Sequence, residues 1–455
     1  MKNLEVFFNP KSVALIGATD RPGSVGLGIC KNLLEGKLRR KIFFVNPYKK
    51  KVLGRKTYPK ITSFKEKIDL AIIAVPAKIV PQVAKECAQK KVGGVIIISS
   101  GFAEIDKEGA RRQKEIVEIL RAAGVPLLGP NCLGVLRPSS KLNASFSPAT
   151  PKAGSIAFLS QSGALIDSII DKSLEEDYGF SALVSYGNAA DLDICDFLKF
   201  LKNDPETKAI CLYIEGIKNG REFIEVAQEV TKEKPIVALK GGKTKVGKKA
   251  VSSHTSALAG APEVFSAAFR KAGIFEVETV EDLLQVTLAL AWQPPCKNGI
   301  GIVTNGGAAG VLTADWCERF RITLPKLEKA VIKKLEKSPE MNPAFSRGNP
   351  LDIVGDALSK RYKVAIENML NQKNIQGLIS IQTLQIMTQV KKNAQVLSKL
   401  KRKFPQKPIL ALLLGGKLSR VGAQILRKNS IPCFFEPRQA ALAMKALIWR
   451  KNFLK

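Results

Sequence analysis

The stretch SVALIGATDRPGSVG, residues 12–26, decides the fold of the first part of the chain. Its apolar start predicts a buried strand, and the glycine-rich turn from Ile16 to Gly26 is expected to open a helix. Such a turn presents backbone N–H groups and a helix N-terminus to a phosphate. The turn lacks the GxGxxG spacing, and Asn46 stands where an NAD site has Asp or Glu. The stretch therefore predicts a site for a phosphorylated nucleotide other than NAD, with a packing turn that binds nothing as the alternative.

Four further apolar runs follow this first strand. They are KIFFVNP (41–47), IDLAIIAVP (68–76), VGGVIIISS (92–100) and VPLLGPN (125–131), with amphipathic helical stretches between them. Repeated strand–helix–strand units of this kind build an open, doubly wound sheet. Residues 1–130 are therefore predicted to form a Rossmann-like domain. A loop rich in Ser, Pro and Ala is expected over residues 138–154.

The remainder of the chain contains an internal repeat, with one copy over residues 131–294 and the other over residues 295–455. Four segments match in the same order: SIAFLSQSGAL with GIGIVTNGGAAG, GNAADLDI with GNPLDIVG, AICLYIEG with GLISIQTL, and PIVALKGGK with PILALLLGGK. Four ordered matches indicate a duplication rather than chance. The predicted fold is α/β, a Rossmann-like domain followed by two flavodoxin-like domains.

The two copies differ in an insertion that contains His254, the single histidine of the chain. After PIVALKGGK the first copy adds TKVGKKAVSSHTSALAGAP (244–262), which is rich in Gly, Ser and Lys and has no apolar face. Such loops often carry function, and imidazole is a nucleophile when an acceptor fixes its tautomer. Glu215 ends the strand AICLYIEG and is the expected acceptor, whereas Gln382 is assigned to the matching position of the second copy. His254 and Glu215 are therefore predicted as a catalytic pair, with a solvated strand-end role for Glu215 as the alternative.

Two glycine-rich turns are predicted to bind phosphate. Each follows a buried strand and begins a helix, where free N–H donors and the positive end of the helix dipole favour an anion. Convergence of the two turns on one transferred phosphoryl group is a hypothesis. The turns consist of Ser160, Gln161, Ser162 and Gly163 in the first copy, and of Asn305, Gly306 and Gly307 in the second.

The composition narrows the class of protein. Lys and Arg number 72 against 40 Asp and Glu, a net charge of +32. They are spread along the whole chain, which favours anionic small ligands over nucleic acid. No apolar run reaches the roughly twenty residues of a membrane span, and the N-terminus has no export signal, so a cytoplasmic location is expected. Eight scattered cysteines and one histidine predict neither a metal site nor a disulfide framework.

Together these motifs resemble the α subunit of ADP-forming acetyl-CoA synthetases, in the superfamily of succinyl-CoA synthetase. The resemblance spans nearly all of the chain and rests on the turn at 16–26, SSGFAE (99–104), GPNCLG (129–134), SQSGA (160–164) and SSHTSALAG (252–260). It implies that His254 is phosphorylated, that Glu215 orients it, and that the two glycine-rich turns bind phosphate. It also implies that the first domain binds CoA through Gly17, Ala18, Thr19, Ser24, Val25, Gly26, Asn46, Lys49, Val75, Pro76, Ser99, Ser100, Gly101 and Asn131.

The resemblance implies a reversible reaction in which acyl-CoA, phosphate and ADP give the free acid, CoA and ATP through an acyl phosphate and a phosphohistidine. No ATP-grasp domain is found in the sequence, so ADP or ATP and Mg²⁺ are expected to bind mainly with a separate ATP-grasp β subunit, in an α2β2 assembly. Two positions depart from the family pattern. Ser256 stands where the family usually has Gly, and TNGGAAG (304–310) where a turn resembling TNAGGPG is expected. Neither departure removes a reactive group.

Three alternatives stand beside this prediction. A non-catalytic CoA-sensing or regulatory module of the same family needs no nucleophile, so the presence of both His254 and Glu215 argues against it. A succinyl-CoA synthetase α subunit ends after the second domain, and the third domain counts against it. A nicotinamide oxidoreductase is disfavoured by Asn46 and by the lack of a second histidine as acid or base.

Overall fold

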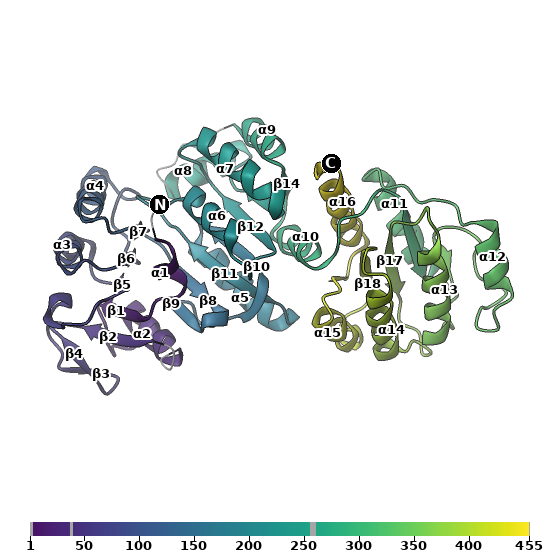
Figure 1. Cartoon of the computed structure of the whole chain (residues 1–455), viewed down its shortest axis with the longest axis horizontal. Coiled ribbons are helices and arrows are strands. Elements are labelled where there is room, and N and C mark those ends of the chain that lie inside the picture. Colours follow the sequence, from purple (N-terminus) through teal and green to yellow (C-terminus); the bar gives the residue numbers. More distant parts are fainter. Residues whose placement is uncertain (1–2, 37–39, 255–260, 455) are drawn as a thin grey trace. The chain divides into compact units, whose positions relative to one another are not determined.

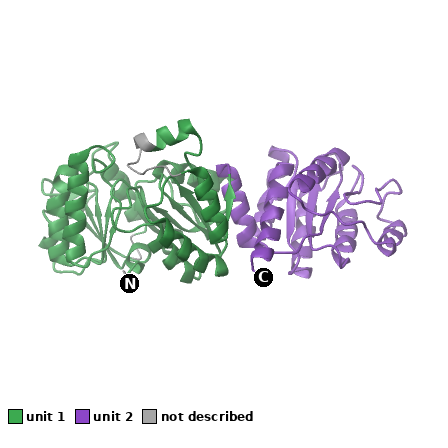
Figure 2. Ribbon diagram, turned by 90° about the horizontal axis from the view of Figure 1, so that it is seen from above, with its two compact units in different colours: residues 1–277 green, residues 278–455 purple. Residues whose placement is uncertain are grey.

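The computed structural model describes residues 3–36, 40–254 and 261–454 of the chain (Figure 1). The chain divides into two compact units, residues 1–277 and residues 278–455 (Figure 2). In its described part, unit 1 contains two seven-stranded sheets and unit 2 a five-stranded sheet. The predicted α/β fold class is confirmed, whereas the bounds of the three domains stay predictions. Within the described residues, every helix is too short or too polar to span a lipid bilayer.

The first sheet of unit 1 has the strand order β3-β4-β2-β1-β5-β6-β7, parallel except for the pairing of β3 with β4. Apolar side chains on both faces explain the parallel arrangement, because alternate residues of β1 enter two different cores. The strands are β1 (Ser12–Ile16), β2 (Lys41–Val45), β3 (Lys51–Val52), β4 (Arg55–Tyr58), β5 (Leu70–Ile73), β6 (Gly94–Ile97) and β7 (Leu127–Leu128). The helices are α1 (Glu5–Phe8), α2 (Val25–Glu35), η2 (Ile61–Ser63), η3 (Ala77–Ile79), α3 (Val80–Lys90) and α4 (Lys107–Ala122).

The second sheet of unit 1 has the order β14-β13-β12-β10-β11-β8-β9, in which β8 and β9 form an antiparallel edge. Strand β9 lies within residues 138–154, so the prediction of a loop there is wrong for this part. The strands are β8 (Gly134–Arg137), β9 (Leu142–Ser145), β10 (Lys152–Ser160), β11 (Gly179–Ser185), β12 (Ala209–Ile214), β13 (Ile236–Lys240) and β14 (Ile274–Val277). The helices are η4 (Pro138–Ser140), α5 (Gly163–Glu176), α6 (Ile194–Asn203), α7 (Gly220–Glu233), α8 (Lys245–His254) and α9 (Pro262–Ala272).

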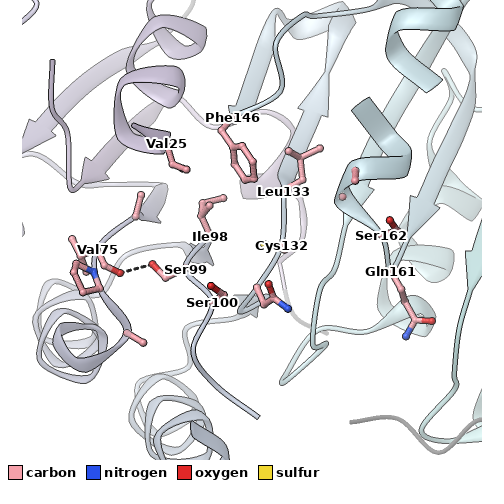
Figure 3. A pocket seen from close by; sticks show the side chains of 16 residues that line it. Val25, Val75, Ile98, Ser99, Ser100, Cys132, Leu133, Phe146, Gln161 and Ser162 are labelled. Atoms are coloured by element: carbon pink, nitrogen blue, oxygen red, sulfur yellow. Dashed lines mark hydrogen bonds between the residues drawn. The ribbon is translucent and has the colours of Figure 1, made fainter. Parts of the chain in front are cut away.

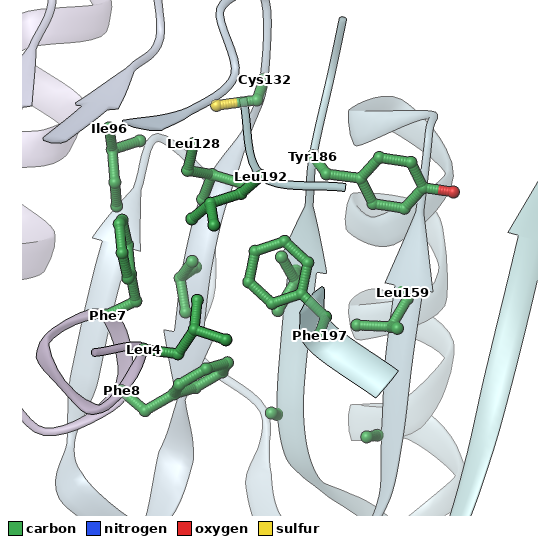
Figure 4. Close-up of a cluster of buried hydrophobic side chains, with 14 of the residues drawn as sticks. Leu4, Phe7, Phe8, Ile96, Leu128, Cys132, Leu159, Tyr186, Leu192 and Phe197 are labelled. Carbon is green, nitrogen blue, oxygen red and sulfur yellow. The ribbon is translucent and has the colours of Figure 1, made fainter. Parts of the chain in front are cut away.

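The two sheets of unit 1 share one hydrophobic core, and the short helix α1 lies in it (Figure 4). Phe7 and Phe8 of α1 are fully buried. The ring of Phe8 stacks on Phe200 at a centroid distance of 4.3 Å and meets Phe197 edge-on at 6.4 Å, both from helix α6. Side chains from both sheets complete this core, so the sheets are fixed against each other.

Unit 2 is built on a sheet with the order β16-β15-β17-β18-β19. This is the order of β11-β10-β12-β13-β14 in the second sheet, which agrees with the predicted duplication. The strands are β15 (Ile300–Thr304), β16 (Leu351–Asp352), β17 (Gly377–Gln382), β18 (Ile409–Leu413) and β19 (Cys433–Phe434). The helices are α10 (Val280–Trp292), α11 (Gly307–Arg319), α12 (Lys329–Glu336), α13 (Ser359–Asn371), α14 (Val390–Lys403), η5 (Lys417–Ser419), α15 (Arg420–Lys428) and α16 (Pro437–Phe453).

The sheet order also tests the four sequence matches behind the repeat. Three of them fall on the equivalent strand pairs β10 and β15, β12 and β17, and β13 and β18. The match of GNAADLDI with GNPLDIVG is wrong, because Gly187 follows strand β11 whereas Gly348 precedes the equivalent strand β16. A shared Gly-Asn pair in two different loops produced this match.

Candidate active site

A pocket of about 520 Å³ opens in unit 1 at the carboxyl ends of parallel strands (Figure 3). One side comes from the segments after β5 and β6 of the first sheet, and the other from the turn after β10 of the second. This edge is where α/β sheets bind their ligands. The lining residues are Val25, Ala74, Val75, Pro76, Ala77, Ile98, Ser99, Ser100, Asn131, Cys132, Leu133, Phe146, Gln161, Ser162, Gly163 and Ala164.

The predicted CoA-binding residues fall into two groups. Those that line the pocket are Val25, Val75, Pro76, Ser99, Ser100 and Asn131. Those that do not are Gly17, Ala18, Thr19, Ser24, Gly26, Asn46, Lys49 and Gly101. Most of the second group lies in the turn after β1 or beside it, so the two groups describe two parts of the expected CoA site.

The turn after β1 is held by close packing. Gly17 has a φ of 97°, and a Cβ at this position would lie 2.3 Å from the carbonyl oxygen of Ala74. A Cβ on Gly26 would lie 2.4 Å from the carbonyl oxygen of Gly17. Ser24 is the N-cap of α2, and its side chain accepts a hydrogen bond from the helix backbone. Close packing leaves no room for a side chain at Gly17 or Gly26. The first turn of α2 has N–H groups without partners inside the helix, and these groups suit a phosphate.

Asn46 and Lys49 shape the loop beside this turn. The side-chain amide of Asn46 donates to the carbonyl of Ala18 at 2.8 Å and accepts from the N–H groups of Tyr48 at 2.8 Å and Lys49 at 3.1 Å. The ammonium group of Lys49 pairs with Asp20 and lowers the pKa of that carboxyl. The predicted contacts of both residues with CoA stay predictions.

The wall after β5 and β6 is fixed by hydrogen bonds between its segments. Ser99 Oγ donates to the carbonyl of Val75 at 2.5 Å, as Figure 3 shows, and the N–H of Asn131 donates to the carbonyl of Ser99 at 3.0 Å. Asn131 has a φ of 56°, in the left-handed region that Asn tolerates better than most residues. The segments that follow strands β5, β6 and β7 therefore meet at this wall.

A polar network around Asn188 lies behind the wall and was not predicted from the sequence. The amide nitrogen of Asn188 donates to Glu104 at 2.6 Å and to Gln113 at 2.9 Å, and its oxygen accepts from Asn131 at 3.3 Å. Glu104 also accepts the N–H of Gly101 at 2.7 Å. Burial by itself raises the pKa of Glu104, but the hydrogen bonds, led by that from Asn188, outweigh it and lower the pKa. The Glu104 carboxylate of the SSGFAE motif thus links the loops of the two sheets of unit 1. This carboxylate was the one feature of the sequence from which the network could have been inferred.

The first predicted phosphate turn joins β10 to α5. Ser160 Oγ donates to the carbonyl of Ser162 at 2.8 Å and accepts its N–H at 3.0 Å. Ser162 is the N-cap of the 14-residue helix α5. Gln161, Ser162 and Gly163 line the pocket, whereas Ser160 is buried beneath the turn. The structure therefore places the start of α5, with its free N–H groups, at the pocket.

The same turn is tied to Glu215. Gln161 Oε1 accepts the backbone N–H of Glu215 at 2.5 Å and that of Gly216 at 3.0 Å. The Glu215 side chain is 5% exposed, and the hydroxyl of Tyr213 donates to its Oε1 at 3.3 Å. Burial and the Glu215 carboxylate raise the pKa of Tyr213 to about 12, so this hydroxyl is a neutral donor. The structure thus brings a predicted phosphate-binding side chain and the predicted catalytic carboxylate into contact.

His254 is the last residue of helix α8, and its side chain lies outside the described part of the structure, as does Ser256. Helix α8 begins the insertion that follows β13. Lys240, at the end of β13, is buried with its Nζ 4.6 Å from the ring centroid of Phe265. Burial lowers the pKa of Lys240, and the Glu215 carboxylate opposes this shift. The contact of His254 with Glu215 stays a prediction.

The second predicted phosphate turn, in unit 2, repeats the geometry of the first. Thr304 Oγ1 donates to the carbonyl of Gly306 at 2.9 Å and accepts its N–H at 3.0 Å. Asn305 Oδ1 accepts the N–H of Thr383 at 2.7 Å. Helix α11 starts at Gly307. Convergence of the two turns stays a hypothesis.

This repeated contact corrects the position that matches Glu215. Gln161 binds the backbone of Glu215 and Asn305 binds the backbone of Thr383, so Thr383 is the equivalent residue. The assignment of Gln382 is wrong by one residue. Thr383 also lacks a carboxylate, so the contrast between the two copies is unchanged.

The described residues fit CoA. The side chains that line the pocket are apolar, hydroxyl, amide or thiol groups, which suit the alkyl and amide groups of a pantetheine arm. The first turn of α2 suits the phosphates. Among the described residues, no cluster of three His, Cys, Asp or Glu side chains could hold a metal ion.

Two family models match successive parts of the chain. Residues 11–138 match the CoA binding domain, and residues 153–290 match the succinyl-CoA ligase like flavodoxin domain. The pocket lies between the parts that these two models cover. The fold and the site therefore define a CoA-binding protein of the succinyl-CoA ligase type.

Individual relatives narrow this class. The chain is 40% identical to "Acetate--CoA ligase [ADP-forming] II subunit alpha" of Pyrococcus furiosus, over 98% of this chain and 97% of the relative. It is also 40% identical to "Acetate--CoA ligase [ADP-forming] I" of Archaeoglobus fulgidus, over 98% of this chain but 63% of that longer relative. The solved dinucleotide forming acetyl-coenzyme A synthetase 1 of Ca. Korarchaeum cryptofilum, in complex with phosphate and ADP, superimposes with a TM-score of 0.93 at 34% identity, covering 100% of this chain and 98% of the other.

The chain belongs to the family of ADP-forming acetate–CoA ligases, in which it aligns from end to end with α subunits. The predicted family, ligase class and CoA-binding domain are confirmed, and the alternative of a non-catalytic CoA-sensing module is not favoured.

Proposed function

We propose that this chain is the CoA-binding and phosphohistidine-carrying α subunit of an ADP-forming acyl-CoA ligase. It converts acyl-CoA, phosphate and ADP reversibly into the free acid, CoA and ATP. The pocket of unit 1 supports this proposal most strongly, because residues expected to hold CoA face a phosphate turn whose Gln161 contacts Glu215. One site can therefore hold a thioester beside a phosphate.

In the first step, phosphate binds at the start of α5, where the N–H groups of Gly163 and Ala164 and the helix dipole stabilise its charge. A phosphate oxygen attacks the thioester carbon, the carbon–sulfur bond breaks, and CoA leaves as the thiolate. The product is an acyl phosphate. Packing of both sheets of unit 1 on one core keeps the two reactants in a fixed orientation.

In the second step, a ring nitrogen of His254 attacks the phosphorus of the acyl phosphate. The bond to the acyl oxygen breaks, the free acid leaves, and a phosphorus–nitrogen bond forms. Glu215 accepts a hydrogen bond from the other ring nitrogen, which fixes the tautomer and stabilises the positive ring. Gln161 holds the backbone of Glu215 in place during this step.

The last step transfers the phosphoryl group to ADP, and for this step we propose a partner. An ATP-grasp β subunit binds ADP or ATP and Mg²⁺, which neutralises the charge on the nucleotide, in an α2β2 assembly. The names of two full-length relatives as α subunits support a partner subunit. The cytoplasmic location stays a prediction.

Phosphoryl transfer tests the proposal directly. The chain is incubated with its β subunit, Mg²⁺ and γ-labelled ATP, and label on this chain is examined for the acid lability and base stability of phosphohistidine. We expect label that is absent from the His254→Ala variant and that discharges when acid and CoA are added. CoA affinity is expected to be unchanged in that variant.

A control separates failure of the proposal from failure of the partner. The same β subunit is assayed with an α chain of known activity. If that control is labelled while this chain binds CoA and takes up no label, the phosphohistidine mechanism is wrong for this chain.

A further inference from the structure

One end of the pocket is an apolar wall built from three separate segments. Val25 is the first residue of α2, Leu133 precedes β8, and Phe146 follows β9, and Figure 3 shows their side chains gathered together. Phe146 is 38% exposed, which is high for an aromatic side chain beside a hydrophobic core. An apolar group on a ligand would cover this surface and gain about 25 cal/mol for each Å² of apolar area removed from water.

The position of Phe146 is fixed on both sides. The side-chain amide of Asn32 in α2 donates to the carbonyl of Ser145 at 2.9 Å and to that of Ser147 at 2.8 Å. A Cβ on Gly28 would meet the Cβ of Phe146 at 3.7 Å and its Cα at 3.9 Å, so the backbone of residue 146 packs against helix α2. These contacts therefore fix the backbone from which the Phe146 ring projects into the wall.

This wall adjoins the place where the acyl carbonyl must lie. A Cβ on Gly163 would lie 2.9 Å from the Cβ of Leu133, so Leu133 packs on the first turn of α5. If phosphate binds there and attacks the thioester carbon, the acyl chain extends from that carbon toward Leu133 and Phe146. This step rests on the proposed function.

The described lining of the pocket also has no charged side chain that could pair with the second carboxylate of a dicarboxylic acid. Among its described lining residues, none is Lys, Arg, Asp, Glu or His. Cys132 is a neutral thiol, because burial raises its pKa to about 12. Burial of an unpaired carboxylate is strongly unfavourable, so a dicarboxylic acid is excluded by the same surface that accepts an apolar chain.

We propose that Phe146, with Val25 and Leu133, forms the acyl subsite, and that Phe146 limits the substrate to short, uncharged acyl groups. Removal of the ring opens space for a branched or aryl chain. Enlargement of the ring closes space that a branched chain needs.

The test is the ratio of kcat/KM values for two acids, measured with the chain and its β subunit. In Phe146→Ala we expect the ratio for phenylacetate over acetate to rise by about 10–200-fold, and in Phe146→Trp the ratio for 3-methylbutanoate over acetate to fall by about tenfold or more. Phe453→Ala is the matched control, since Phe453 is 36% exposed in unit 2, and both ratios should stay within about twofold of wild type. Succinate should be turned over at less than about a hundredth of the rate with acetate.

Binding gives a second measurement that needs no partner. Isothermal titration of the chain alone should show tighter binding of phenylacetyl-CoA, relative to acetyl-CoA, in Phe146→Ala than in wild type. Unchanged ratios in both Phe146 variants, or ready turnover of succinate, would overturn this inference while the proposed function stands. Absence of turnover with every acid, beside an active β subunit, would instead remove the proposed function and this inference with it.

Discussion

The side-chain oxygen of Gln161 lies 2.5 Å from the backbone nitrogen of Glu215 and accepts its hydrogen. Gln161 belongs to the turn that starts α5, and Glu215 follows strand β12, so this contact links two loops of the second sheet. The turn that is proposed to hold phosphate and the residue that is proposed to orient His254 are therefore joined by a direct hydrogen bond.

Loss of this contact should slow the reaction more than it weakens the fold. In Gln161→Ala we expect phosphorylation of His254 to slow by roughly 10- to 100-fold, since small misplacements of reacting groups cost about this much. Rapid-quench measurement of labelled phosphohistidine checks it. Gln228→Ala is the control, because the side-chain amide of Gln228 donates to the backbone carbonyl of Lys271 on the surface of unit 1. Equal rates in the two variants would contradict the role of Gln161.

Tyr213 should act on the reaction through Glu215. Its hydroxyl donates to the carboxylate at 3.3 Å, and a hydrogen bond to a charged group contributes about 1.5–3 kcal/mol. Because this distance is long, we expect the lower end, a loss of about tenfold in the rate of His254 phosphorylation in Tyr213→Phe. The measurement is the single-turnover rate beside the melting temperature.

A double variant shows whether Tyr213 acts through the carboxylate. In a Glu215→Ala background, Tyr213→Phe should change the residual rate by less than about twofold, because the acceptor is gone. A full tenfold loss in that background would show that Tyr213 acts elsewhere.

The loss of stability caused by three Gly→Ala substitutions should follow the backbone conformation and the free space at each glycine. Gly17→Ala combines a φ of 97° with a Cβ 2.3 Å from the carbonyl oxygen of Ala74, so we expect loss of both stability and CoA binding. Gly23→Ala has a φ of 70° but nothing within 4 Å, so we expect a cost of about 1–2 kcal/mol. Gly220→Ala has neither problem and should be neutral. Denaturant unfolding and CoA titration check the order.

The ion pair between Arg137 and Asp204 should make unit 1 sensitive to acid. Two hydrogen bonds of 2.8 and 2.7 Å join the side chains, which are 4% and 3% exposed. Burial alone raises the pKa of Asp204, but the hydrogen bonds from Arg137 and Thr207 outweigh it and lower the pKa. Because the folded pKa lies below the unfolded value of about 3.9, the stabilisation is present above about pH 4 and is lost as the pH falls through the folded pKa.

The Asp204→Asn variant isolates this contribution. Breaking a buried pair costs about 3–5 kcal/mol, so the variant should be destabilised by that amount at pH 6. Below about pH 4 the difference between variant and wild type in the free energy of unfolding should shrink. A difference that stays constant from pH 6 to pH 3 would contradict the assigned charge state.

The strands and the glycine-rich turns could be predicted because their signals are local. β10 and β15 are apolar runs that end in a turn and a helix start, and the sequence shows each of these features within a few residues. The edge strand β9 could not be predicted, because LNAS is a short, mixed segment that pairs with β8 through backbone groups. Phe146 follows this strand, so its place in the pocket was hidden for the same reason.

Contacts between segments that are distant in the chain also could not be predicted from the sequence. The hydrogen bonds of Asn188 with Glu104 and Gln113 join residues that are far apart in the chain. Nothing in the local pattern around Asn188 indicates a buried network. The comparison of the two copies located Glu215, but a slip of one residue in that comparison gave Gln382 in place of Thr383, and the hydrogen bonds of Asn305 corrected it.

The aromatic contacts of helix α1 also bear on how the protein is synthesised. Phe8 leaves the ribosome long before Phe197 and Phe200, the rings against which it packs. At roughly 5–20 residues per second, α1 waits on the order of ten seconds or more for these partners. During that time the ring of Phe8 lacks these two partner rings and is accessible to molecular chaperones. Unit 1 therefore cannot complete its core while it is being translated until the second sheet has emerged.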